Sequence, residues 1–273
     1  MIKNRSKQIK KAKVINTGSL FAVFDIDYSY FGVGGVNLAN APQYLNYDLK
    51  YLEKYKNAIR KDAKVVFVLP DFVFAVSSEQ YKIQNDIYYK EFFPWQIEGF
   101  SFRKFLNVYI SLFTQKIKKV LKKGNVETIL TPQSDDQKMK DIGNMVEAWK
   151  DTFKIESLQS GYLSEEQRNN ISQNKAYLDK MIEVVKSVGA ECFLVIPPCS
   201  KQMNDNFSVE CLESFLFNPV TECAEKSDVK VLNYLYDERF SGLEFYRNGF
   251  CLNHKGSKLF TTVLLNDIGI EVQ

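Results

Sequence analysis

Short apolar runs alternate with longer amphipathic stretches along most of this chain. The clearest run is Val65–Leu69, which is β-branched and apolar and ends at Pro70 and Asp71, as expected for a strand covered on both faces. Further strands are predicted at residues 14–15, 35–38, 192–196 and 229–233. Because helical patterns separate these runs, we predict an α/β fold, a three-layer α/β/α sandwich with a mostly parallel sheet.

Apolar residues at helical spacing mark the intervening helices. These helices are predicted at residues 45–55, 103–123, 174–188, 209–226 and 255–267. Residues 80–102 are aromatic and irregular, whereas 127–161 are polar and weakly periodic. We therefore expect a basic tail over 1–12 and a single domain over 13–273. That domain contains an aromatic and helical insertion at about 80–161, held by ring packing and ending in a long loop or flap.

The composition is that of an ordinary globular chain. Its 273 residues are 45% hydrophobic and 25% charged, which is enough for one large core. The net charge of +3 comes from basic clusters near the N-terminus and at 116–123. Neither cluster has the interleaved aromatic residues of a nucleic-acid groove, so we expect no nucleic-acid partner.

Cysteine and histidine are too sparse for a metal centre. The five cysteines show no CxxC spacing and the only histidine is His254, so neither a metal nor another cofactor is expected. No apolar run approaches the roughly 20 residues that span a bilayer, and no signal-peptide core follows the basic start. We expect a cytoplasmic protein, or one associated with the cell envelope if a leader or anchor precedes this sequence.

The stretch KVINTGSLFAVF, residues 13–24, is where we expect the functional site. An apolar run ends at Gly18, and a new apolar run follows Ser19 at once, which indicates a strand, a tight turn and a helix. In open α/β sheets the carboxyl ends of parallel strands and the following helix starts form the ligand crevice. The residues of this turn therefore carry most of the functional information.

Five short blocks carry a family resemblance. They are NTGS at 16–19, GVNLANAPQ at 35–43, VVFVLPDF at 65–72, FLVIPP at 193–198 and CLNHKGSKLFT at 251–261. In this order they resemble the SGNH/GDSL hydrolases, above all divergent bacterial members associated with surface-polysaccharide loci. The resemblance implies a flavodoxin-like sandwich that hydrolyses or transfers acyl esters, often acetyl groups on glycans.

The catalytic positions implied by that resemblance are substituted. The family has a serine nucleophile in the first block and Asp-x-x-His in the last. Gly18 and Ser19 match the residues before the nucleophile, Leu20 occupies its position, and Asn248 and Cys251 occupy those of the carboxylate and the base. Acyl transfer needs a hydroxyl, a base that takes its proton and a carboxylate that orients the base. The triad is therefore predicted to be lost.

The oxyanion positions implied by the resemblance are altered as well. Ala39 and Asn40 lie where a small residue would offer its amide to the negative charge, and their amides could still bind an oxygen. The third block lacks the family's Gly-x-Asn-Asp and has Asp71 after the strand. We predict that Gly18, Ser19, Ala39, Asn40 and Asp71 line a ligand-binding crevice.

Two alternatives keep an enzyme possible. Ser19 could be a nucleophile with His254 as its base, although His254 lies three residues beyond the matched position. Cys251 could be a nucleophilic thiolate near a helix N-terminus, or a buried thiol that fills a vacated histidine position. We expect the acidic pairs at 25 and 27 and at 135 and 136 to be helix-start or loop residues.

These observations lead to three functional hypotheses. The first is a noncatalytic binding or scaffold protein in bacterial surface-polysaccharide biosynthesis, whose partner is a glycan, an acylated carbohydrate or a protein of that pathway. The second is an active carbohydrate O-acyl esterase or acyltransferase with an unconventional serine and histidine. The third is an interaction module that binds a partner through the aromatic residues 80–102.

Overall fold

The computed structural model describes residues 2–83, 85–121 and 133–271. The chain divides into two compact units. The first unit comprises Met1–Val76 with Gln133–Gln273, and the second comprises Ser77–Pro132. Each unit is described in turn.

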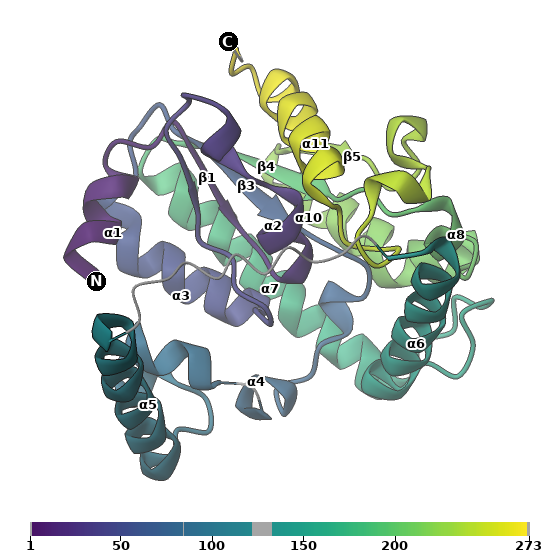
Figure 1. Cartoon of the computed structure of the whole chain (residues 1–273). Helices are drawn as coiled ribbons and strands as arrows, with labels where there is room; N and C mark the ends of the chain where they lie inside the picture. Colours follow the sequence, from purple (N-terminus) through teal and green to yellow (C-terminus); the bar gives the residue numbers. More distant parts are fainter. Residues whose placement is uncertain (1, 84, 122–132, 272–273) are drawn as a thin grey trace. The chain divides into compact units, whose positions relative to one another are not determined.

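The first unit is built on a five-stranded parallel sheet with the order β2-β1-β3-β4-β5 (Figure 1). The strands are β1 (Val14–Thr17), β2 (Gly35–Asn37), β3 (Lys64–Val68), β4 (Glu191–Ile196) and β5 (Lys230–Asn233). All five predicted strands are present, with bounds within two residues of those expected. The strand order is the flavodoxin-like one that the resemblance implied.

Helices cover both faces of this sheet (Figure 1). On one face α7 (Glu165–Ser187) packs against α3 (Leu45–Tyr55) and α10 (Asn218–Ser227). On the other face α2 (Leu20–Asp25) packs against α11 (His254–Asp267). The three-layer α/β/α prediction is therefore confirmed.

The remaining helices are shorter or lie outside these layers. They are α1 (Ile2–Ile9), α4 (Gln80–Ile83), α5 (Phe102–Leu121), α6 (Asp135–Phe153), α8 (Lys201–Asn204) and α9 (Val209–Leu212). A π-helical turn at Glu213–Phe217 joins α9 to α10, so the helix predicted at 209–226 is nearly continuous. The basic N-terminal stretch forms α1, whose last residue, Ile9, is fully buried.

The prediction of a loop over 127–161 is wrong for most of the described residues in that range, because α6 occupies Asp135–Phe153. Ser134 caps this helix by accepting a 3.3 Å hydrogen bond from the Gln137 N–H. The two acidic residues of the first turn interact favourably with the helix dipole, which confirms them as helix-start residues. The capping signal was present in the sequence, although the apolar period of α6 is weak. Residues 127–132 lie outside the described part of the chain.

An aromatic cluster follows the end of β3. Phe72 is fully buried with φ of 58°, a left-handed conformation that is uncommon for a bulky residue. Its ring lies 5.3 to 5.7 Å from the rings of Trp149, Phe153, Phe207 and Phe215. This packing holds α6 and the α9–α10 segment against the end of β3.

The second unit is held together by ring packing, as expected for the aromatic stretch. Tyr88, Tyr89 and Phe92 are buried within it, around 3-10 turns at Asp86–Lys90 and Pro94–Gln96. Helix α5 begins one residue before the predicted start at 103. The last two predicted residues of that helix, 122 and 123, lie outside the described residues.

Candidate functional site

The predicted site lies at the topological switch point of the sheet. Neighbouring strands β1 and β3 are followed by helices on opposite faces, because α2 and α7 lie in different layers. Thr17 and Phe67 are paired at the carboxyl ends of these strands. Ligands bind open α/β sheets at such points, so the loops at 18–19 and 69–72 occupy the favoured position.

Gly18 is fixed by both its backbone and its surroundings. Its φ is +133°, and a Cβ atom there would lie 3.0 Å from the Val68 carbonyl oxygen, so only glycine fits without strain. The Gly18 N–H donates a 3.0 Å hydrogen bond to Oδ1 of the buried Asp48 on α3. The loop after β1 is thus tied to α3.

Asp48 accepts a second hydrogen bond, from Gln43 Nε2 at 2.5 Å. Burial raises the pKa of this carboxyl to about 7, and the hydrogen bonds oppose that rise. The sequence analysis missed both residues. Asp48 falls among Leu45, Leu49 and Leu52 on the apolar face of its helix, a signal that could have identified a buried acid.

The hydroxyl of Ser19 is part of the same network. Ser19 Oγ accepts a 3.0 Å hydrogen bond from the Gln43 N–H, while His254 Nδ1 lies 2.5 Å from the Tyr30 hydroxyl at the start of α11. The exposed His254 ring also packs edge-on against the Tyr30 ring, with centroids 4.9 Å apart. The structure, which describes both residues, shows no hydrogen bond between Ser19 and His254.

Leu20 occupies the first position of α2 and is half-buried. Its aliphatic side chain supplies no nucleophilic atom at the point where the resemblance expects a serine. The next residue, Phe21, is buried and lies 6.5 Å from the Phe250 ring, measured between centroids. Apolar packing therefore connects the start of α2 with the last sequence block.

Cys251 is fully buried, with a relative exposure of 0%. Burial raises the pKa of its thiol, and the nearby Asp25 carboxylate raises it further, so the thiol is protonated at neutral pH. The Cys251 N–H donates a 2.9 Å hydrogen bond to Asn248 Oδ1. These two residues are therefore neighbours, but an amide and a buried thiol offer neither a base nor its orienting carboxylate.

Asp25 is the residue of this region that sequence reasoning described wrongly. It is the last residue of α2 rather than a helix-start or loop residue, and its exposure is 0%. Its Oδ1 accepts a 2.8 Å hydrogen bond from the Leu252 N–H, whereas its Oδ2 has no hydrogen-bond partner. Burial raises its pKa well above the usual range. The spacing of four residues from the buried Phe21 was the available signal. Asp27 behaves as expected and caps the next turn by accepting from the Ser29 N–H.

The two predicted oxyanion positions form hydrogen bonds within their own loop. The Ala39 N–H donates to Asn37 Oδ1 at 2.9 Å, and the Asn40 side-chain amide donates to Gln43 Oε1 at 2.5 Å. Gln43 is thus bonded to Asn40, Ser19 and Asp48 at once. These contacts stabilise the loop and leave the Ala39 amide engaged.

Asp71 is buried without any hydrogen-bond partner on either carboxylate oxygen. Burial raises its pKa to about 7. Burial raises the pKa of the Cys199 thiol, which lies three residues after β4, and the charge of Asp71 raises it further. A buried carboxyl without a hydrogen-bond partner is uncommon and calls for an explanation, of which a bound ligand is one.

Neither a metal centre nor a disulfide is formed by the described residues. Among them, no group of three or more His, Cys, Asp or Glu side chains converges on one point. All five cysteines are unpaired and buried.

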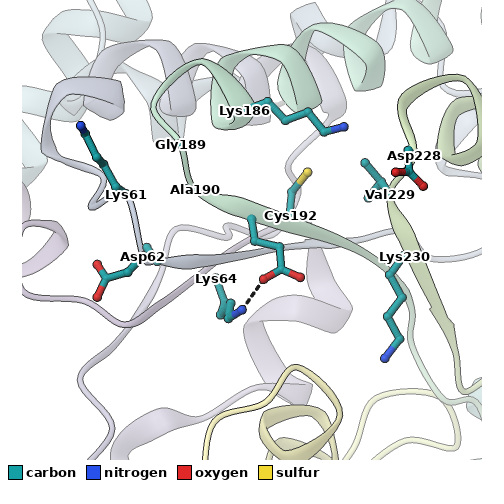
Figure 2. Close-up of a pocket in the computed structure, with 12 residues that line it drawn as sticks. Lys61, Asp62, Lys64, Lys186, Gly189, Ala190, Cys192, Asp228, Val229 and Lys230 are labelled. Carbon is teal, nitrogen blue, oxygen red and sulfur yellow. Dashed lines mark hydrogen bonds and ion pairs between the residues drawn. The ribbon is translucent and has the colours of Figure 1, made fainter.

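A pocket of about 340 Å³ lies at the opposite, amino-terminal edge of β3, β4 and β5 (Figure 2). It is lined by four lysines and three acids, a net charge of +1. Lys64 is paired with Glu191, and Lys186 and Lys230 donate to the carbonyl oxygens of Ser227 and Asp267. Because three of the four ammonium groups already have partners, we assign no anion to this pocket.

No protein-family model matches this chain, and no curated protein sequence matches it. Solved structures that resemble it include a candidate acylhydrolase from Bacteroides fragilis, with 10% identity and a TM-score of 0.44 over 97% of this chain and 92% of that one. They also include protein YxiM from Bacillus subtilis, with 12% identity and a TM-score of 0.45 over 96% of this chain and 58% of that one. Likeness at this level says nothing about a shared reaction.

Proposed function

We propose that this protein is an SGNH-hydrolase-like chain without acyl-ester chemistry, which acts as a binding or scaffold protein. The observation that carries the proposal is the fully buried, protonated Cys251 at the position of the base, together with Leu20 at the position of the nucleophile. Neither the hydroxyl that would give up a proton nor the imidazole that would accept it is present at these two positions.

The hydrogen-bond network around Ser19 supports a binding role. Gly18, Asn40 and Gln43 hold the loops at the switch point in one arrangement, and such preorganisation lowers the entropy cost of binding a ligand. The unpartnered Asp71 can accept hydrogen bonds from hydroxyl groups. We therefore propose a glycan or an acylated carbohydrate as the ligand, or a partner protein of a polysaccharide assembly pathway.

The biological process in the proposal is bacterial surface-polysaccharide assembly. This part rests on the resemblance of the five sequence blocks alone. A rival function is an active carbohydrate O-acyl esterase or acyltransferase that uses Ser19 and His254. It would require both residues to exchange their present partners, Gln43 and Tyr30, for each other.

Hydrolysis of p-nitrophenyl acetate and of an acetylated glycan tests the proposal. We expect the wild-type protein and the variants Ser19→Ala and His254→Ala to release product at the same rate as buffer. An active serine esterase in parallel shows that the assay works. Turnover by the wild-type protein that Ser19→Ala abolishes would establish the rival function and overturn this one.

Calorimetric titration with acetylated and deacetylated glycan tests the binding role. We expect Asp71→Ala to weaken glycan binding, and Asp62→Ala, which removes an exposed carboxyl at the opposite edge of the sheet, to leave it unchanged. Equal binding by both variants would remove Asp71 from the proposed site.

A further inference from the structure

Helix α5 of the second unit exposes a row of apolar side chains. Phe102, Leu106 and Ile110 are 65%, 43% and 60% exposed, and their spacing of four residues places them along one face of the helix. The neighbouring Phe105 turns into the unit, where its ring lies 6.2 Å from that of Tyr89. The helix thus has one apolar face inside the second unit and another directed to solvent.

A second apolar feature of this unit is a stacked pair of rings. Phe93 and Trp95 are 62% and 79% exposed, and their rings are stacked with centroids 4.8 Å apart and an interplanar angle of 5°. The turn that carries them is closed by a 3.0 Å hydrogen bond from the Phe93 N–H to Gln96 Oε1. The turn therefore presents both rings to solvent in a defined arrangement.

The charge of the chain is distributed unevenly between the two units. Residues 77–132 contain nine Lys and Arg against five Asp and Glu, a net charge of +4, whereas the rest of the chain has 27 against 28. Helix α5 contains five basic residues and no acidic one. An amphipathic helix with this charge suits an anionic surface.

We propose that the second unit docks on the surface of a bilayer that contains anionic phospholipid. Trp95, Phe93 and the exposed row of α5 enter the headgroup region, while the exposed Lys90 and Arg103 contact the phosphates. The unit lies on the bilayer rather than crossing it, since no helix in the described part of the chain could span one. This surface is independent of the proposed loss of catalysis.

Tryptophan fluorescence gives a direct readout on the full-length chain. The chain has two tryptophans, so Trp149→Phe leaves Trp95 as the only one. With vesicles of phosphatidylcholine containing about one third phosphatidylglycerol, we expect its emission to shift to shorter wavelength and to be quenched by brominated lipid. Phosphatidylcholine alone should produce neither effect, and added salt should reduce both.

Co-sedimentation with the same vesicles measures the contribution of each feature. We expect Trp95→Ala/Ile110→Ala and Lys90→Glu/Arg103→Glu each to weaken binding at least about tenfold. The matched controls are Tyr162→Ala/Val209→Ala and Lys61→Glu/Lys180→Glu, which change equally exposed side chains of the first unit and should bind like the wild-type protein. Circular dichroism of each variant confirms that it is folded.

Three results would overturn this proposal. One is a Trp95 emission that does not change when anionic vesicles are added. The apolar face would then be assigned to an acidic groove on a partner protein. Another is a loss of vesicle binding in the control variants that equals the loss in the test variants. The third is a dimer in sedimentation velocity that Trp95→Ala/Ile110→Ala dissociates, which would assign the face to a second copy of the chain.

Discussion

Two parts of the same sheet edge have very different interiors. On the side of β1 and α3, Gly18, Ser19, Gln43 and Asp48 form a closed set of hydrogen bonds. On the side of α11, Cys251 is fully buried beside Asp25 and Asn248, between the buried Phe250 and Leu252. The first part is a preorganised polar loop, whereas the second places a buried thiol and an amide where the resemblance implies a base and its carboxylate.

The two parts differ in how much stability a single substitution costs. A buried polar network is costly to alter one member at a time, because each loss leaves another group without its hydrogen bond. Cys251 and Phe250 are buried side chains, so substitutions there act mainly through packing. A single substitution is therefore expected to disturb the first part through lost hydrogen bonds and the second part through altered packing.

The largest effect is expected from Gly18→Ala, which breaks the hydrogen-bonded part. Its φ of +133° and the 3.0 Å approach to the Val68 carbonyl oxygen should lower the free energy of unfolding by about 3 kcal/mol. Urea unfolding measures the change. Gly32→Ala is the matched control, since a Cβ there meets no atom within 4 Å. Equal stability of the two variants would contradict the assigned strain.

The next effect is expected from Cys251→His, which tests the packed part. The imidazole is larger than the thiol, and the site is fully buried, so overpacking should lower the free energy of unfolding by about 2 kcal/mol. We expect no hydrolysis of p-nitrophenyl acetate by this variant, because Leu20 still offers no nucleophile. An unchanged urea midpoint would show that the cavity already accommodates an imidazole.

A smaller effect of opposite sign is expected from Asp71→Asn. Burial raises the pKa of Asp71 to about 7, against about 3.9 in the unfolded chain. At pH values between these two pKa values, Asp71 keeps its proton in the folded state and has lost it in the unfolded state. The free energy of unfolding therefore falls as pH rises, by up to about 1.4 kcal/mol per pH unit. The asparagine cannot ionise, so it should raise stability at pH 8 by about 1 to 2 kcal/mol.

Urea unfolding of this variant at pH 5 and pH 8 checks the sign. The wild-type protein should lose more stability than Asp71→Asn between the two pH values. Asp62→Asn is the control, because its exposed carboxyl has a lowered pKa beside Arg60 and does not contribute to this slope. A variant that is less stable than the wild-type protein at pH 8 would show that the Asp71 carboxylate has a favourable partner.

The sequence predicted the sheet well because its strands are short apolar runs between helical patterns. Val65–Leu69 illustrates this, since β3 differs from it by one residue at each end. The sequence did not reveal the buried acids Asp25 and Asp48, because charged residues are usually exposed and only the tertiary fold brings Leu252 and Gly18 to their carboxyls.

The sequence predicted the location of the candidate site better than it predicted the contacts of the residues there. Strand ends and the switch point follow from element order, so Gly18, Ser19 and Asp71 lie where expected. The partner of Ser19 is Gln43, which comes from a loop 24 residues away, and no local pattern could select it over His254. Whether these residues bind a ligand stays a prediction.

The smallest effect is expected from Leu20→Ser, which restores only the nucleophile. Leu20 is half-buried at the first position of α2, where serine is well tolerated, so stability should change by less than about 1 kcal/mol. Without a base beside it the new hydroxyl stays protonated, so we expect no hydrolysis of p-nitrophenyl acetate. Turnover by Leu20→Ser that disappears in Leu20→Ser/His254→Ala would show that His254 reaches the site. That result would favour the rival esterase function over the proposed binding role.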